Sequence, residues 1–435
     1  MPGRSAVMFA AALAAAPCCG GSTDRPDAPP IVDGDGPPVP TAITIRVFPD
    51  RVPSFSGRTE NAPLVAFQDG DGPWVALTGT GGIYNATATD RRYAVAVGCS
   101  GLAPRSLPGV TFYYQSVSDT TEVLANGCGS ELPTVRLTVE VPDLGPAETA
   151  EVWLGNQFSP APPGISADID HPRGSADLFV RSFTTGDPAV VVAKLYRGPT
   201  IDLQDDRTMQ VNINSVGLPP EVHPLTVTGV DPQDTTFVLS SYATPRSELQ
   251  QFPLDTQTIT GAPDSYITIA RAMRQPDDIS NVTASVTGPF VGFQRIQRIL
   301  RVAMKTPGAL ALQLPPAYTA PAPRLDRVAV ARATVTIVFM TPTLAVSDYS
   351  ASFISSSPTR FLTAFVRPGY GLGSPSVTIT TPDLSGLPGW AANMALGIGP
   401  VNWSVLWSDR NMPRETPDVD GRRSIDSAII GQFAP

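Results

Sequence analysis

Tyr93-Ala94-Val95-Ala96-Val97 is the stretch that shows the fold class most clearly. Tyr93, Val95 and Val97 share one face of an extended chain, because successive side chains of a strand point to opposite sides. Just upstream, Asp69-Gly70-Asp71-Gly72-Pro73 separates two similar runs and has the composition of a hairpin turn. Gly and Pro together make up 84 residues (37 plus 47) of the 435, which disfavours long helices. The pattern predicts an all-β protein.

Short runs of this kind recur from Thr41 onward. The expected strands are Thr44–Phe48, Leu64–Gln68, Trp74–Leu77, Ile83–Thr89, Tyr93–Cys99, Thr334–Met340, Tyr349–Ile354, Phe361–Val366, Val377–Thr380 and Trp403–Trp407. One window, which holds Ile296, Ile299, Leu300 and Ala303, fits either a helical stripe or a strand.

The length suits about three or four domains. We expect tandem immunoglobulin-like or transthyretin-like β-sandwiches at 41–132, 133–220, 221–313 and 324–435, with the proline-rich segment 314–323 as a boundary.

A faint repeat at a spacing of about 87 residues indicates that the second and third modules are related. The matched segments are Leu137-Thr138-Val139 with Leu225-Thr226-Val227, Thr149–Leu154 with Thr235–Leu239, and Asp177 with Asp264. Short β motifs also coincide by chance, and that alternative stays open.

The first module carries Gly82-Ile83-Tyr84 followed by Asp90-Arg91-Arg92-Tyr93-Ala94-Val95. Over about 20 residues this pairing resembles the carboxypeptidase-regulatory-like and transthyretin-like sandwiches. The resemblance implies a stalk or presenting domain without an active site of its own.

The N-terminus predicts export. Residues 1–19 combine Arg4, the apolar stretch Ala6–Ala16 and a Cys18-Cys19 pair that resembles the end of a bacterial lipoprotein signal. Lipidation of Cys18 or Cys19 would anchor the chain in a membrane, and the proline-rich residues 20–40 would form an extended tether. The predicted location is the cell envelope, at the outer membrane. There are two alternatives. The chain could be secreted in the ordinary way to the periplasm or medium, or the N-terminus could be an uncleaved apolar tail.

Cys99 and Cys128 are the remaining cysteines. An oxidising compartment would allow them to form a disulfide that closes a loop of about 30 residues. Two buried free thiols are the alternative.

The composition argues against nucleic-acid binding and against the common kinds of catalytic site. The chain has 30 basic and 39 acidic residues, a net charge of −9, which argues against a nucleic-acid partner. It has two histidines, and the sequence motifs of serine hydrolases, zinc proteases and P-loop proteins are missing. We expect no cofactor.

Two acidic segments invite a metal interpretation. Asp69 and Asp71 could offer oxygens to calcium, although the spacing departs from an EF-hand and favours a plain turn. Asp168, Asp170 and His171 lie in what reads as a polar loop, where the histidine would point away from the two carboxylates. His223 reads as structural.

Aromatic residues near the C-terminus could bind a glycan. Trp390, Trp403, Trp407 and Tyr370 would serve as a stacking face if exposed, whereas core packing is the commoner fate of tryptophan in a sandwich. Elsewhere, Arg295, Arg298, Arg301 and Lys305 form a small basic stripe, which in a chain with a net charge of −9 favours a solvated face over the alternative of a phosphate site.

These observations predict a non-catalytic surface or periplasmic lipoprotein that acts in binding, adhesion or scaffolding, with a glycan or protein as ligand. The alternative is a secreted carbohydrate-active hydrolase whose two carboxylates lie far apart in sequence.

Overall fold

A computed structural model describes residues 39–48, 59–101, 107–128, 134–155, 157–184, 191–244, 251–327, 331–356, 358–397, 399–412 and 419–433. The predicted signal segment 1–19, both cysteines Cys18 and Cys19, and nearly all of the predicted tether 20–40 lie outside these residues.

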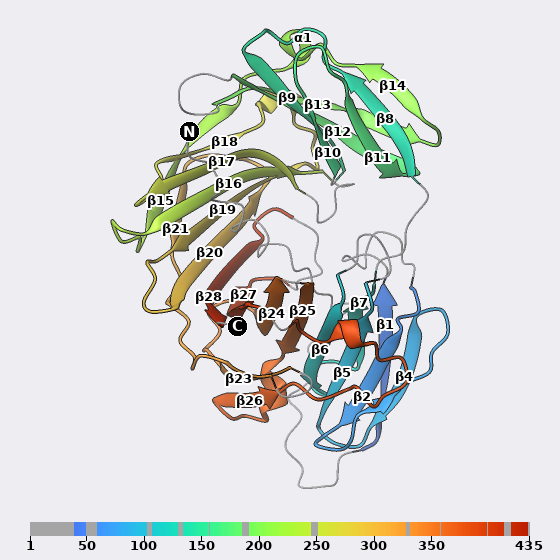
Figure 1. Cartoon of the computed structure of the whole chain (residues 1–435). Coiled ribbons are helices and arrows are strands. Elements are labelled where there is room, and N and C mark those ends of the chain that lie inside the picture. The colour runs from blue at the N-terminus through green and yellow to red at the C-terminus, as the bar shows by residue number, and fades with distance from the viewer. Residues whose placement is uncertain are drawn as a thin grey trace.

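The prediction of an all-β chain of tandem sandwiches is confirmed. The described strands form four sandwiches, and each packs a three-stranded sheet against a four-stranded one (Figure 1). Alternating burial within the strands explains the arrangement, because each strand turns one apolar face toward the opposite sheet. The window at Ile296–Ala303 forms part of a strand rather than a helix.

The first sandwich encloses a core that includes Ile45, Tyr93 and Tyr113. Its three-stranded sheet, in the order β4-β1-β7, comprises β1 (Thr41–Phe48), β4 (Ile83–Ala88) and β7 (Glu122–Asn126). Its four-stranded sheet, in the order β3-β2-β5-β6, comprises β2 (Leu64–Asp69), β3 (Val75–Ala76), β5 (Arg92–Cys99) and β6 (Gly109–Ser116).

The second and third sandwiches have the same topology. In the second, sheets β10-β9-β12-β13 and β11-β8-β14 comprise β8 (Thr134–Glu140), β9 (Glu148–Leu154), β10 (Gln157–Ala161), β11 (Ala167–Pro172), β12 (Gly174–Thr184), β13 (Val191–Leu203) and β14 (Arg207–Gln210). In the third, strands β17-β16-β19-β20 and sheet β18-β15-β21 comprise β15 (Glu221–Thr228), β16 (Thr235–Ala243), β17 (Phe252–Thr260), β18 (Ser265–Thr268), β19 (Ile279–Thr287), β20 (Gln294–Met304) and β21 (Leu310–Gln313).

This shared topology places two of the three sequence correspondences on equivalent strands. Leu137-Thr138-Val139 and Leu225-Thr226-Val227 lie in β8 and β15, and the second matched pair lies in β9 and β16. The third correspondence was wrong, because Asp177 lies in β12 whereas Asp264 precedes β18, which is the counterpart of β11.

The fourth sandwich has a core built around Phe353, Trp403 and Trp407. Its sheet β22-β23-β26 comprises β22 (Arg324–Asp326), β23 (Arg332–Val338) and β26 (Ser376–Thr380), and its four-stranded part comprises β24 (Val346–Ser356), β25 (Thr359–Val366), β27 (Val401–Arg410) and β28 (Arg423–Phe433).

Three of the four-stranded sheets join edge to edge into one sheet of 12 strands. β28 pairs antiparallel with β20 of the third sandwich, and β25 pairs parallel with β6 of the first. The C-terminal sandwich therefore lies between the third and the first, and the four units follow a curved path (Figure 1). Edge pairing of this kind satisfies backbone groups that isolated sandwiches would leave open.

The second sandwich packs against the third through a buried apolar cluster. The cluster comprises Phe179, Phe183, Val192 and Leu195 from the second and Tyr242, Phe252, Leu254, Ile267 and Ile269 from the third. Burial on this scale makes the two units one packed body.

Among the described residues, helical structure is limited to α1 (Ile213–Val216) and the 3-10 turns η1 (Arg271–Met273), η2 (Pro368–Gly371) and η3 (Ala392–Met394). Within the described ranges, no helix has the length and apolar character needed to cross a membrane.

Candidate functional site

The most exposed apolar group of the described residues lies at the tip of the β19–β20 hairpin. We call residues 289–294 the aromatic hairpin. Phe290, Val291 and Phe293 are 63%, 80% and 82% exposed. Large apolar side chains that gather on the surface in this way mark interaction sites more often than single exposed ones do.

A tight turn positions these side chains. Val291 and Gln294 exchange backbone hydrogen bonds of 2.8 and 3.3 Å, so Gly292 and Phe293 form a two-residue turn. Gly292 has a φ of 63°, which the first central position of a type II′ turn requires and which glycine adopts without a steric penalty. The side chains within and just before the turn are therefore held in place by local backbone geometry.

A basic side chain lies at the base of the hairpin. The guanidinium carbon of Arg295 lies 4.9 Å from the centre of the Phe290 ring, within the range of a cation–π contact. Its Nε is buried without a hydrogen-bond partner, and no ion pair to Arg295 is present among the described residues. Because Nε is buried, an external anionic group would bind the terminal nitrogens of the guanidinium.

The aromatic hairpin is attached to a firm support. β19 and β20 pair in register from Ser280↔Met304 to Thr287↔Gln297, and β20 also pairs with β28 over nine positions from Gln294↔Gly431 to Val302↔Arg423. Both neighbours of β20 thus hold it within the shared sheet. A ligand bound at the tip would therefore be attached to the 12-stranded sheet that three of the sandwiches share.

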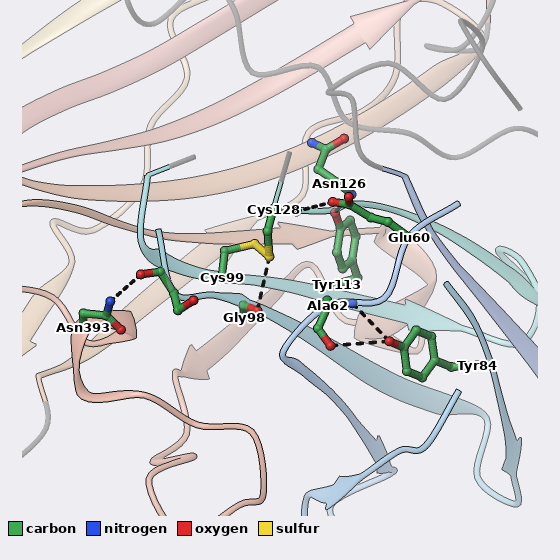
Figure 2. The surroundings of a disulfide bond; sticks show 10 residues. Glu60, Ala62, Tyr84, Gly98, Cys99, Tyr113, Asn126, Cys128 and Asn393 are labelled. Carbon is green, nitrogen blue, oxygen red and sulfur yellow. Dashed lines mark hydrogen bonds between the residues drawn. A yellow bond between two sulfur atoms is a disulfide. The ribbon is translucent and has the colours of Figure 1, made fainter. Parts of the chain in front are cut away.

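The predicted disulfide is confirmed and joins the two sheets of the first sandwich (Figure 2). Cys99 ends β5, Cys128 follows β7, and their Cα atoms are 5.2 Å apart. The Cys128 N–H donates to the Glu60 carboxylate at 3.0 Å, and Asn393 of the fourth sandwich donates to the Ser100 carbonyl beside Cys99. The disulfide thus stabilises the first sandwich near its contact with the fourth.

The four candidate stacking aromatics belong to the core of the fourth sandwich. Trp403 and Trp407 share one face of β27, as expected, but that face is covered and their exposures are 4% and 0%. Tyr370 is buried in η2 with its ring 5.2 Å from that of Tyr114, and Trp390 is half-buried against the same core. In this arrangement Trp403, Trp407 and Tyr370 do not offer a ring face to a sugar.

Asp69 and Asp71 occupy the turn between β2 and β3 and bind donors of the protein itself. Asp69 accepts hydrogen bonds from the N–H groups of Thr89 and Asp90 at 3.0 and 2.9 Å, and Asp71 pairs with Arg92. Burial raises the pKa of Asp69, but the hydrogen bonds from Thr89 and Asp90 outweigh it and hold that pKa below its usual range. The carboxylates stabilise the turn and the adjoining strand.

Asp168, Asp170 and His171 lie in strand β11, so the expectation of a loop was wrong. Buried Ala167 and Ile169 alternate with exposed Asp168 and Asp170, and this alternation makes the segment a strand despite the flanking prolines and glycines. Asp168 accepts from Thr138, and Asp170 pairs with Arg136 at 2.9 Å.

His171 points away from the two aspartates, as the extended geometry predicts. Its Nδ1 lies 2.7 Å from the Pro172 carbonyl oxygen, and burial lowers its pKa.

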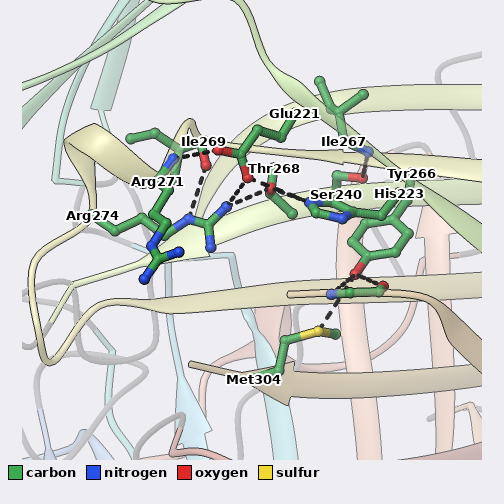
Figure 3. Close-up of polar contacts among 11 residues, drawn as sticks. Glu221, His223, Ser240, Tyr266, Ile267, Thr268, Ile269, Arg271, Arg274 and Met304 are labelled. Carbon is green, nitrogen blue, oxygen red and sulfur yellow. Dashed lines mark hydrogen bonds and ion pairs between the residues drawn. The ribbon is translucent and has the colours of Figure 1, made fainter. Parts of the chain in front are cut away.

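His223 belongs to a polar cluster between β15 and β18 (Figure 3). Its Nε2 lies 3.0 Å from the Thr268 hydroxyl, and its ring lies 5.3 Å from that of Tyr266. Glu221 pairs with Arg274 and accepts the Arg271 N–H at 2.6 Å. Burial lowers the pKa of His223. These contacts hold the edge of the third sandwich together.

Within the described ranges, no three histidine, cysteine, aspartate or glutamate side chains gather as a metal site would require. The basic stripe divides between the two faces of β20, because residues three apart on a strand point in opposite directions. Arg298 pairs with Asp234 and Lys305 with Asp277, whereas Arg295 lies against Phe290.

The aromatic hairpin was not predicted. Phe290–Phe293 looks strand-like by composition, although Gly288, Pro289 and Gly292 are turn residues. Phenylalanine and valine at turn positions, where polar residues are usual, were the available signal.

No family model and no curated protein match the chain. Among solved structures, it is similar to the FN1–FN3 domains of chicken CNTN1 at 10% identity, with 77% of this chain and 93% of that chain covered and a TM-score of 0.13. It is also similar to a streptococcal ancillary pilin at 7% identity, with 64% and 100% covered and a TM-score of 0.14. Such low TM-scores carry no information about the function of this chain.

Proposed function

We propose that this chain is a non-catalytic binding or adhesion protein of the cell envelope. The observation that carries the proposal is the aromatic hairpin, which places three apolar side chains in solvent at the tip between two strands of the 12-stranded sheet. Exposed apolar surface is unfavourable in water by about 25 cal/mol per Å², so a retained cluster of this kind suits a binding role.

Attachment to the envelope would come from the N-terminus. The Cys18-Cys19 pair after an apolar stretch supports lipid modification, and the disulfide supports an oxidising compartment. A peptide mass spectrum of the mature N-terminus, from the full chain exported by a Gram-negative host, tests this point. A diacylglyceryl adduct on Cys18 or Cys19 is expected, and an unmodified N-terminus would refute the anchor.

Binding is tested with the labelled full chain on intact cells and isolated envelopes. We expect saturable retention that is lost in the double variant Phe290→Ser/Phe293→Ser. The matched control is Val222→Ser, which removes an exposed valine (66%) from another part of the third sandwich. Equal retention of both variants would contradict the proposal.

The same incubation addresses catalysis. A binding protein leaves its ligand chemically unchanged, so the supernatant should contain no soluble sugars or peptides beyond those from cells without protein. Release of such products in proportion to protein and time would favour the hydrolase alternative.

A further inference from the structure

We propose that the aromatic hairpin contacts a lipid bilayer, with Phe290, Val291 and Phe293 at the headgroup–acyl boundary and Arg295 on an anionic headgroup. The inference rests on the proposed binding role of the hairpin and names its partner. Three features of the molecule favour a membrane over another protein: the size and shape of the tip, the chemistry of Arg295, and the local charge.

The tip is small and convex. Each phenylalanine can bury about 150–250 Å². Two phenylalanines and a valine on a two-residue turn therefore fall short of the roughly 800 Å² per partner that a stable protein interface needs. A bilayer imposes no such requirement, because a few apolar side chains can enter the boundary region and add to a second attachment such as a lipid chain.

Arg295 has the chemistry of a headgroup contact. Its guanidinium lies over the Phe290 ring and makes no ion pair within the described part of the chain. A guanidinium binds phosphate oxygens with two parallel donors, and a side chain at the base of an inserted tip lies at the level of the headgroups. The apolar tip would therefore lie at the headgroup–acyl boundary, and the Arg295 guanidinium would lie among the headgroups.

The charge of the sequence segment that contains the hairpin also favours a membrane as the partner. Between Asp278 and Asp326 the sequence has no aspartate or glutamate, although the chain has 39 acids in 435 residues. The same segment contains the basic residues Arg295, Arg298, Arg301, Lys305 and Arg324, of which Arg298 and Lys305 pair with Asp234 and Asp277. The whole chain has a net charge of −9, but this segment contains basic residues and no acidic ones. An anionic surface would therefore not repel it.

Depth-dependent quenching gives the direct test. The full-chain variant Phe293→Trp is mixed with phosphatidylcholine–phosphatidylglycerol vesicles whose acyl chains are brominated, and the signal of wild-type protein is subtracted to remove the native tryptophans. We expect a blue shift and quenching that the control Val222→Trp does not show. Quenching no greater than that of the control would overturn the proposal.

Vesicle flotation measures the energetic contribution. All variants keep the N-terminal segment, so differences report on the hairpin. We expect Phe290→Ser/Phe293→Ser to lower partitioning at least about tenfold, and Val222→Ser to leave it unchanged. Arg295→Gln should lower partitioning about fivefold on vesicles with phosphatidylglycerol and less on phosphatidylcholine alone. An equal loss on both would refute the headgroup contact.

The two proposals fail in different ways. Unchanged vesicle partitioning of the double phenylalanine variant, together with lost retention on cells, would overturn the lipid contact and leave the binding role, with a protein or glycan as partner. Unchanged behaviour in both assays would overturn both proposals.

Discussion

Arg197 of the second sandwich forms an ion pair with Asp278 of the third, with 3.1 Å between Nε and Oδ2. Both side chains are nearly inaccessible, at 4% and 0% exposure. The Tyr242 hydroxyl and the Gln275 N–H also donate to Asp278, so its charge is satisfied from several directions. Next to the apolar cluster between the two units, this pair fixes how the second and third sandwiches meet.

Removing one member of that pair should be costly. Asp278→Ala would leave the buried Arg197 guanidinium with only the more distant Asp177 carboxylate, at 3.9 Å, and we expect a loss of about 3 kcal/mol in the free energy of unfolding, measured by urea denaturation. The control is Glu122→Ala, which breaks the exposed pair with Arg46 and should cost at most about 1 kcal/mol. Similar losses for the two variants would contradict the role assigned to the buried pair.

The disulfide should stabilise the first sandwich. Its two cysteines are 29 residues apart, and closing a loop of that length is worth roughly 3–4 kcal/mol in the unfolded-chain entropy model. We expect Cys99→Ala/Cys128→Ala to unfold at correspondingly lower urea concentration. A reductant should shift the wild-type protein toward the variant and leave the variant unchanged. Equal stability of the two proteins under oxidising conditions would argue against this contribution.

Gly431 should tolerate no side chain. It lies opposite Trp403 in the β27–β28 pair, and a Cβ on Gly431 would clash with the indole ring. Gly431→Ala should therefore displace Trp403 and cost about 1–3 kcal/mol, visible as a lower thermal midpoint. Gly386→Ala is the control, because nothing lies within 4 Å of its added carbon. An unchanged midpoint for Gly431→Ala would show that the indole can move freely.

The two histidines should make stability depend on pH. Burial lowers the pKa of His171 and of His223 below 6.5, so the unfolded chain binds protons more readily than the folded one. Their contribution is full above pH 6.5 and is lost as pH falls through the folded pKa values. We expect the free energy of unfolding to fall between about pH 7.5 and pH 5.5.

The double variant His171→Gln/His223→Gln isolates this effect. Its free energy of unfolding should change less steeply over the same pH range, whatever its absolute stability. A slope equal to that of the wild-type protein would mean that other groups cause the dependence.

Each of the ten segments expected as strands forms a strand, because one-sided burial imposes a two-residue period that is visible in the sequence. Thr41–Phe48, Arg92–Cys99 and Val401–Arg410 each contain a run expected from alternation alone. The segment Asp168–His171 was misread because its flanking prolines and glycines outweighed its alternation, whereas pairing of β11 with β8 made it a strand.

The candidate site was less predictable. Trp403 and Trp407 lie on one face of β27 in any structure, but whether that face is open depends on the sheet formed by β22, β23 and β26. Phe290 and Phe293 look like core residues by composition, and they are exposed because the turn at Gly292 carries them beyond the paired strands.

The sequence by itself determined an all-β chain of sandwich modules, because alternation is a local property. It predicted the pairing of its two remaining cysteines only from their number and the expected oxidising compartment. Only the tertiary structure decided that the C-terminal sandwich joins the first to the third, through β25 with β6 and β28 with β20. Backbone hydrogen bonds between strand edges carry no side-chain signature, so the sequence does not mark which edges meet.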